Sequence, residues 1–279
     1  MDTLNQVEEF YKRYTGRKEI LAYSACNQPI YAFYIGKEED NIPKILAQYG
    51  MHAREWITTH LALYHIERGI SDGYAVIVPL VNPDGVALAT RGQTFLQTLS
   101  MDRQAFLYKA NGASTDFSLW KANANAVDIN VNFDADWGEG VSNIRYPSFE
   151  NFIGNSVASE IETQVLVALT KKFLPNMTFS YHSKGEEIYW YYKQEGDAYR
   201  QAEVFANYIA ERTGYTAKKI SGSCGGYKDW CILKKKLLAL TIEVGKNSWK
   251  HPIGVTHLPE LIQRNGNSLQ DAINFYKAL

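Results

Sequence analysis

The chain has 279 residues, of which 46% are hydrophobic and 13% aromatic. This is enough to bury one large core, so a single domain can account for the whole length. Its 29 basic and 30 acidic residues leave a formal net charge of −1, which offers no positive field for nucleic acid or an anionic membrane. No apolar run reaches the length of a membrane span, and no basic patch precedes an apolar stretch near the N-terminus, so we expect a cytoplasmic protein.

Predicted strands and helices alternate along the chain. Strands are predicted near residues 18–24, 30–36, 44–50, 74–81, 177–182, 187–192 and 238–244. Helices are predicted near residues 3–14, 55–69, 100–109, 159–173, 197–213 and 258–278. Residues 92–126 show little pattern. This alternation is typical of an α/β fold, and we expect a mixed, mostly parallel twisted sheet of about eight strands with helices on both faces.

Three cysteines, Cys26, Cys224 and Cys231, are too few and too irregularly spaced for a disulfide framework or a zinc finger. We expect all three to be buried thiols.

The most informative motif is a histidine and a glutamate, His52 and Glu55, directly after the predicted strand 44–50. If a helix opens there, both side chains lie on one side of its first turn and can share one zinc ion. Catalytic zinc usually has three protein ligands, and His182, at the end of a predicted strand, is the candidate for the third. The alternatives are a solvated helix face for the pair and a hydrogen-bonded strand-end histidine for His182.

Further motifs follow in an order that resembles one known family. They are Asn82-Pro83-Asp84-Gly85 after a strand, two alternate asparagines in residues 127–134, a helix start at 158–164, and the apolar run 238–245 with Glu243. Together with the histidines and Glu55, they resemble the zinc carboxypeptidases, the M14 metallopeptidases, from about residue 52 to the end. The resemblance implies one catalytic domain over residues 1–279 and one zinc ion per chain, bound by His52, Glu55 and His182.

The resemblance also implies roles for Glu243 and Lys121. A carboxylate in an apolar strand is costly unless it is paired or used, and Glu243 could take a proton from the attacking water and pass it to the leaving amine. Its alternative role is a structural ion pair. Lys121 stands where the family usually has an arginine that stabilises the oxyanion, and a lysine keeps the charge but loses the planar fork. Its alternative is a solvated lysine.

Departures from the family pattern bear on the substrate. Asn130 is kept, but Val131 stands where the family has an arginine that grips a peptide's C-terminal carboxylate. The family's mobile tyrosine falls on Ser221, although Tyr227 could substitute for it. Lys228 falls on the position that tunes the pocket for the leaving residue. A lysine there favours a side chain with an anionic far end, and the alternative is an exposed lysine on a turn.

A leaving residue with a distant carboxylate fits meso-diaminopimelate, with Arg54 and Asn130 available for other acidic groups. Residues 181–190 also resemble the bacterial branch of the family that cuts γ-D-glutamyl-diaminopimelate bonds. We therefore expect a zinc peptidase whose partner is a small murein peptide, with neither nucleic acid nor membrane bound. An ordinary carboxypeptidase is the nearer alternative, and the missing arginine at Val131 argues against it. A non-enzymatic binding module is the more distant one, because such proteins typically lose a ligand or the glutamate.

Overall fold

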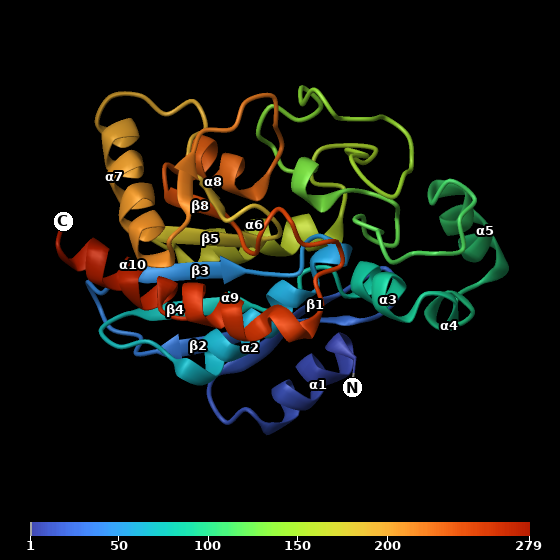
Figure 1. Ribbon diagram of the computed structural model, residues 1–279, viewed down its shortest axis with the longest axis horizontal. Helices are drawn as coiled ribbons and strands as arrows, with labels where there is room; N and C mark the ends of the chain where they lie inside the picture. The colour runs from blue at the N-terminus through green and yellow to red at the C-terminus, as the bar shows by residue number, and fades with distance from the viewer. Residues whose placement is uncertain (1) are drawn as a thin grey trace.

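The computed structural model describes residues 2–279 as one eight-stranded sheet with helices on both faces (Figure 1). In chain order the strands are β1 (Lys18–Tyr23), β2 (Pro29–Gly36), β3 (Lys44–Gln48), β4 (Tyr74–Val78), β5 (Met177–His182), β6 (Glu187–Tyr189), β7 (Thr216–Lys218) and β8 (Leu238–Glu243). Across the sheet their order is β1-β2-β4-β3-β5-β8-β6-β7. The pairs β4–β3, β3–β5, β5–β8 and β6–β7 are parallel and the other three are antiparallel, which confirms the predicted sheet.

Helices cover the two faces of the sheet unequally. One face carries α1 (Thr3–Arg13), α2 (Ile57–Arg68), α7 (Gly196–Thr213), α9 (Leu258–Asn265) and α10 (Ser268–Lys277); in Figure 1, α2, α9 and α10 lie in front of the strands. The other face carries α6 (Ile161–Phe173) and α8 (Tyr227–Lys235). Helices α3 (Pro83–Arg91), α4 (Gln93–Leu96) and α5 (Met101–Ala110) stand to one side. None of the helices in residues 2–279 combines the length and the apolar character that crossing a membrane requires.

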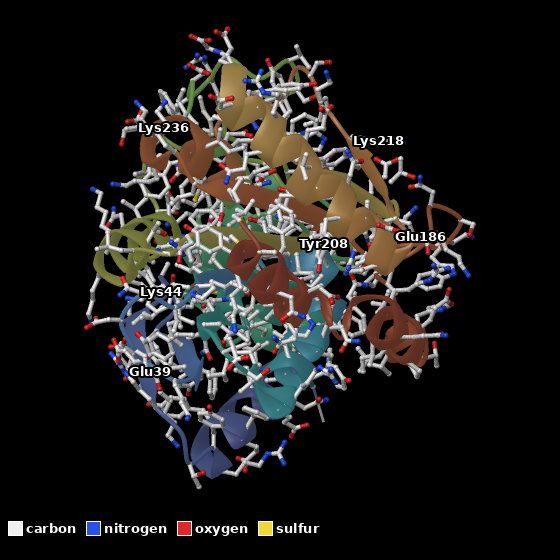
Figure 2. The ribbon with its side chains drawn as sticks, turned by 90° about the vertical axis from the view of Figure 1, so that its left-hand side faces the viewer. Glu39, Lys44, Glu186, Tyr208, Lys218 and Lys236 are labelled. Carbon is white, nitrogen blue, oxygen red and sulfur yellow. The ribbon has the colours of Figure 1, made fainter. Side chains whose placement is uncertain are left out.

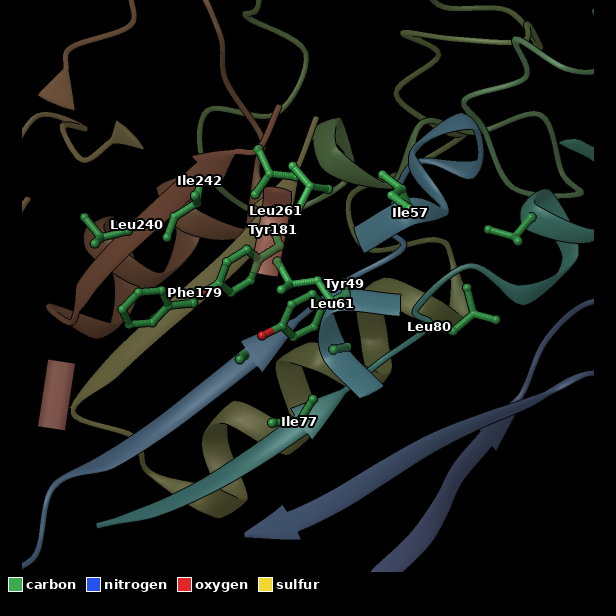
Figure 3. Close-up of a cluster of buried hydrophobic side chains, with 14 of the residues drawn as sticks. Tyr49, Ile57, Leu61, Ile77, Leu80, Phe179, Tyr181, Leu240, Ile242 and Leu261 are labelled. Carbon is green, nitrogen blue, oxygen red and sulfur yellow. The ribbon is translucent and has the colours of Figure 1, made fainter. Parts of the chain in front are cut away.

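Alternation along the central strands sends side chains into two separate cores. The larger core, under α2, α7, α9 and α10, receives Tyr49 just after β3, Phe179 and Tyr181 from β5, and Leu240 and Ile242 from β8 (Figure 3). The intervening residues therefore point to the face covered by α6 and α8. At the carboxyl ends of β5 and β8 those residues are His182 and Glu243, so the fold itself places both on the same side of the sheet.

Figure 2 shows the side of the molecule on which β3 and β8 begin. The labelled Lys44 begins β3 and the labelled Lys236 lies just before β8. Both strands therefore run away from this side, toward the loop-rich part of the chain that is coloured green in Figure 1. In open α/β sheets ligands bind beyond the carboxyl ends of the strands, which is where His182 and Glu243 lie.

Several element boundaries differ from the prediction. The expected helix 258–278 is two helices, because the chain turns at Gly266, where a Cβ would lie 2.6 Å from the carbonyl oxygen of Ile262 and 2.9 Å from the Tyr64 ring. The expected strand 187–192 ends at Tyr189. The Asn-Pro-Asp-Gly turn opens α3, with the Asn82 side chain accepting a hydrogen bond from the Gly85 N–H at 2.9 Å.

Other features were not anticipated at all. Within residues 92–126, which show little pattern in the sequence, α5 matches the predicted helix 100–109, but α4 was not predicted, and both α8 and β7 were missed. The cysteines are all free, but only Cys231 is buried, whereas Cys26 and Cys224 are partly exposed. The expectation of three buried thiols was therefore wrong for two of them.

A buried carboxylate in the first turn of α6 couples folding to pH. Glu162 is 1% exposed, and its Oε2 accepts a hydrogen bond from Asn123 Nδ2 at 3.2 Å. The same amide group donates to Glu160 Oε2 at 2.7 Å. Burial raises the pKa of Glu162 to about 8, so the folded protein holds this proton more tightly than the unfolded chain does.

Glu162→Gln should flatten the dependence of stability on pH. A carboxyl pKa that is higher in the folded state makes stability fall as pH rises from the unfolded value near 4.5 to about 8, by up to about 1.4 kcal/mol per pH unit. Glutamine removes this loss and can still accept the Asn123 hydrogen bond. Urea unfolding between pH 5 and 8 checks this, with the exposed Glu39→Gln (Figure 2) as control. Parallel curves for Glu162→Gln and wild type would contradict it.

Candidate metal centre and active site

Three buried side chains meet beyond the carboxyl ends of β3 and β5. His52 follows β3, Glu55 ends the short 3₁₀ helix η1 (Ala53–Glu55), and His182 is the last residue of β5. The expected α-helical turn is thus a 3₁₀ turn, and α2 begins only at Ile57. One nitrogen or oxygen from each side chain lies within 4.8 Å of those of the other two, so the pairing predicted from the sequence is present in space.

The donor atoms of this triad converge on one position. His52 Nδ1 lies 2.9 Å from Glu55 Oε1, His182 Nδ1 lies 3.0 Å from Glu55 Oε2, and the two Nδ1 atoms are 3.0 Å apart. Burial alone would raise the pKa of Glu55, but His52 and His182 hold it well below its usual range, so the carboxylate is charged. Two imidazole nitrogens and one carboxylate form a donor set that suits catalytic zinc, and these residues fit one metal ion.

Asp128, to which the sequence assigned no role, connects the triad to Lys121. It is fully buried, with Oδ1 at 3.3 Å from His52 Nε2 and Oδ2 at 2.7 Å from Lys121 Nζ. The backbone N–H groups of Asn130 and Asn151 also donate to its carboxylate, at 3.1 and 3.2 Å. The sequence offered one indication that Asp128 belongs to the site: it lies two positions before Asn130, which was proposed to bind substrate. Asp128 fixes the orientation of His52 and the position of Lys121 together.

Lys121 is not a solvated lysine. Its side chain is 17% exposed, and although burial opposes its charged form, Asp128 raises its pKa. The ammonium group of Lys121 is therefore charged and held in place. Asp128 contacts both this group and His52, so the positive charge lies close to the metal ligands. This position is compatible with the role in oxyanion stabilisation that the resemblance implies.

Asp128→Asn should weaken zinc binding by roughly ten- to a hundredfold, the usual scale for losing a partner that orients a ligand histidine. An amide keeps the shape, but it removes the charge that holds both His52 and Lys121. Competition with a fluorescent chelator measures the change. The control is Asp134→Asn, because Asp134 forms a half-exposed pair with Lys234 at 3.0 Å. Equal zinc affinity in both variants would show that Asp128 does not support the centre.

Glu243 completes the site from the next strand. It pairs in parallel register with His182, and alternation places its side chain on the same face of the sheet. Burial raises the pKa of Glu243 to about 8. A divalent cation held by the triad would lower that pKa again, because it favours the charged carboxylate. Glu243 is thus placed to exchange a proton beside the metal centre.

A cavity of about 240 Å³ adjoins the centre on the side of Lys121. It brings together Lys121, Asn130 and Ser221, three residues that the sequence proposed for the site, and Val131 contributes to its wall. Arg54 lies in η1, between His52 and Glu55 in the sequence, and its Nη1 is 3.1 Å from Glu150 Oε2 and 3.3 Å from the carbonyl oxygen of Leu119. The cavity is therefore a candidate subsite for the leaving residue.

Two of the proposed substrate-binding residues are placed differently from expectation. Tyr227 is fully buried in the core under α8, with its hydroxyl 2.7 Å from Thr170 Oγ1, so the structure contradicts its use in place of a mobile tyrosine. Only its backbone N–H reaches the site, donating to Asn130 Oδ1 at 3.2 Å. Lys228 was expected at the pocket for the leaving residue, but it is not among the residues that line the cavity. Nor is it the exposed turn lysine of the alternative interpretation, because its side chain is 6% exposed and pairs with Asp229.

Comparison with known proteins agrees with this geometry. The zinc carboxypeptidase family, Peptidase_M14, matches residues 1–259. The chain belongs to this family of zinc metallopeptidases. A particular relative is the "Gamma-D-glutamyl-L-diamino acid endopeptidase 1" of Lysinibacillus sphaericus, which is 29% identical over 249 residues, covering 82% of this chain and 61% of that protein. This chain thus spans less than two thirds of that relative's length.

Solved structures confirm the carboxypeptidase-like fold. Thrombin activatable fibrinolysis inhibitor matches with a TM-score of 0.77 and 18% identity, covering 98% of this chain and 73% of that chain. The murein-tripeptide amidase MpaA from Escherichia coli O157 matches with a TM-score of 0.60 and 22% identity, covering 93% and 92%. At these identities the two likenesses show the fold and no more.

Proposed function

We propose that this chain is a zinc peptidase that hydrolyses the amide bond between γ-D-glutamate and meso-diaminopimelate in small murein peptides. The observation that carries the proposal is the wall of the 240 Å³ cavity, where Val131 stands beside Asn130. Among the described residues that line it, Lys121 is the one cation, and it is already paired with Asp128. A guanidinium fork for a C-terminal α-carboxylate is therefore missing from this wall. The name of the Lysinibacillus relative supports the same substrate class.

In the proposed reaction, each residue of the centre has a separate task. Zinc held by His52, Glu55 and His182 would lower the pKa of water and polarise the carbonyl of the bond to be cut. Glu243 accepts a proton from the attacking water and returns it to the leaving amine nitrogen. Lys121 gives one of its three N–H donors to Asp128 and directs the others toward the carbonyl oxygen as it becomes negative.

A release assay tests the proposal. Purified protein should liberate meso-diaminopimelate from L-Ala-γ-D-Glu-meso-diaminopimelate, lose this activity with a chelator, and regain it with added zinc. An ordinary peptide with a free C-terminus serves as the competing substrate. Release of its C-terminal residue, with no cleavage of the γ-glutamyl bond, would instead make the protein an ordinary carboxypeptidase.

We also propose that the protein is located in the cytoplasm, and cell fractionation tests this.

A further inference from the structure

The side chain of Asn82 connects the segment of the first two metal ligands to the segment of Lys121. Its Nδ2 group donates to the carbonyl oxygen of Met51, the residue before His52, at 3.1 Å. The same group donates to the carbonyl oxygen of Ala122, the residue after Lys121, at 3.0 Å. Asn82 is 0% exposed, and the low dielectric of such a site strengthens both hydrogen bonds.

The cap of α3 explains only the other half of this amide. Oδ1 of Asn82 accepts from the Gly85 N–H at 2.9 Å, and serine or aspartate caps a helix about as well as asparagine does. Gly85 makes room for the rest of the arrangement, because a Cβ there would lie 2.4 Å from the carbonyl oxygen of Ala122 and 2.5 Å from Asn82 Nδ2. Both residues of the Asn-Pro-Asp-Gly motif are therefore explained by the contact with Ala122 and not by α3 alone.

The Asn82 amide adds a second point of attachment between the two segments. The first is a backbone hydrogen bond from the Ala53 N–H to the carbonyl oxygen of Lys121 at 3.1 Å. One such bond holds two segments together but lets them pivot. Contacts with Met51 and Ala122, on either side of that bond, fix the angle between the segments as well.

Residues 121–128 are braced as one unit by Asn123. Its Oδ1 accepts from two backbone N–H groups of the same segment, at 3.0 and 3.1 Å, and its Nδ2 donates to Glu160 Oε2 at 2.7 Å. Lys121 and Asp128 are the two ends of this segment, and their side chains pair at 2.7 Å. A contact that holds the second residue of the segment therefore also sets the place of this pair.

The spacing between the metal and the ammonium group matters most in the transition state. The carbonyl oxygen of the substrate becomes negative there, and both positive charges must reach the same atom. A misplacement of about 1 Å can lower the rate by about a hundredfold. Binding of the uncharged carbonyl in the ground state depends much less on this spacing.

We infer that Asn82 is a positioning residue whose amide group sets the spacing between the metal and Lys121. The inference rests on the proposed function in one respect, the role of Lys121 at the carbonyl oxygen. It does not depend on the identity of the leaving residue, so any peptide that the protein cuts can test it. Asn82 acts through the backbone of Met51 and Ala122 and not on the substrate itself.

Asn82→Ser tests this role, because serine keeps an oxygen for the cap of α3 but has no amide for the two carbonyl groups. In the zinc-loaded protein kcat should fall at least about tenfold while KM stays within about threefold of wild type. The matched control is Asn265→Ser at the end of α9. Asn265 is also 0% exposed, and its Nδ2 donates to Leu261 and Tyr215 at 3.1 and 2.9 Å. This control should lose stability but keep kcat within about threefold of wild type, and an equal kcat in the two variants would overturn the inference.

A double-mutant cycle shows whether Asn82 acts through Lys121. Lys121→Met keeps the length of the side chain but removes the ammonium group. Added to Lys121→Met, Asn82→Ser should lower kcat by less than about threefold, because no charge is left to position. A merely structural role would give the same loss of kcat in both backgrounds, and that result would contradict the inference.

Inorganic phosphate provides a measurement that needs no turnover. As a tetrahedral anion it can contact the zinc and Lys121 together, so its calorimetric Kd for the zinc-loaded protein reports their spacing. Asn82→Ser should weaken phosphate binding at least about tenfold, and Asn265→Ser should leave it unchanged. An unchanged Kd in Asn82→Ser, or no binding to wild type, would overturn the inference.

Two further results are separable from these. If wild type cuts neither the γ-D-glutamyl peptide nor an ordinary peptide, the proposed function fails, and the phosphate measurement still decides the inference. If Asn82→Ser does not fold, Asn82→Asp replaces it. Aspartate keeps the volume and the cap oxygen, but it can donate at most one hydrogen bond, so the same losses of kcat and phosphate affinity are expected.

Discussion

Replacing Glu243 by glutamine should lower kcat by at least about a hundredfold and leave both the fold and the zinc content intact. Glu243 pairs with His182 at the carboxyl ends of adjacent parallel strands, so its carboxylate stands beside the metal ligands without belonging to the triad. Glutamine has the same shape but cannot accept the proton of the attacking water. Single-turnover hydrolysis of the diaminopimelate peptide, together with metal analysis of the same protein, measures both quantities.

Glu187→Gln is the matched control for this variant. Glu187 lies opposite Glu243 in the antiparallel pair of β6 and β8, but its carboxylate contacts Lys218 and the hydroxyl of Tyr189. Loss of its charge should therefore leave kcat within about threefold of wild type. A normal rate in Glu243→Gln, or a loss equal to that of Glu187→Gln, would give the role of base to another group.

The pH dependence of the wild type follows from the same residue. A general base works in its charged form, so kcat should fall as pH falls through the pKa of Glu243. Burial raises that pKa to about 8 in the protein without metal, and zinc beside it would shift the acidic limb to lower pH. In Glu243→Gln the residual activity should lose this limb, and a limb that persists at the same pH would belong to a different group.

The sequence predicted the structure well where hydrophobic residues follow the regular pattern of a strand or helix. Apolar runs predicted the strands that end near His52, His182 and Glu243, and the resemblance to the zinc carboxypeptidases assigned these residues to one site. In the structure all three lie at the carboxyl edge that the parallel strands β3, β5 and β8 share. His52 and Glu55 are only three positions apart, so the prediction that they lie close together holds even though the turn between them is 3₁₀ rather than α-helical.

The contacts that could not be predicted from the sequence lie in segments without a regular helix or strand pattern. Asp128 and Lys121 are only seven positions apart, but both belong to an irregular segment in which the direction of a side chain depends on neighbours distant in the chain, such as the backbone of Asn151. The pairing of Lys228 with Asp229 was missed for a related reason. Helix α8 is short and rich in charged residues, and adjacent residues on a helix do not normally face each other.

Replacing His182 by alanine should remove stoichiometric zinc from the purified protein. The triad supplies three ligands from two segments of the chain, residues 52–55 and the end of β5, and His182 is the one that comes from β5. Structural zinc sites with four ligands bind with about 10–16 kcal/mol, or roughly 3 kcal/mol for each ligand. Loss of one ligand should therefore weaken binding by about a hundredfold or more. Zinc analysis after dialysis against metal-free buffer measures this directly.

The zinc should also be visible in the stability of the wild type. Zinc bound only by the folded state stabilises it, so a chelator should lower the Tm of wild type and leave the Tm of His182→Ala almost unchanged. His257→Ala is the control, because His257 stacks on Trp249 and is not among the triad ligands, and it should keep one zinc ion per chain. Full zinc content in His182→Ala, or a wild type that contains none when prepared without chelator, would refute the metal centre. Zinc retained by His182→Ala with activity lost would instead assign the metal to other ligands and leave His182 a role in catalysis alone.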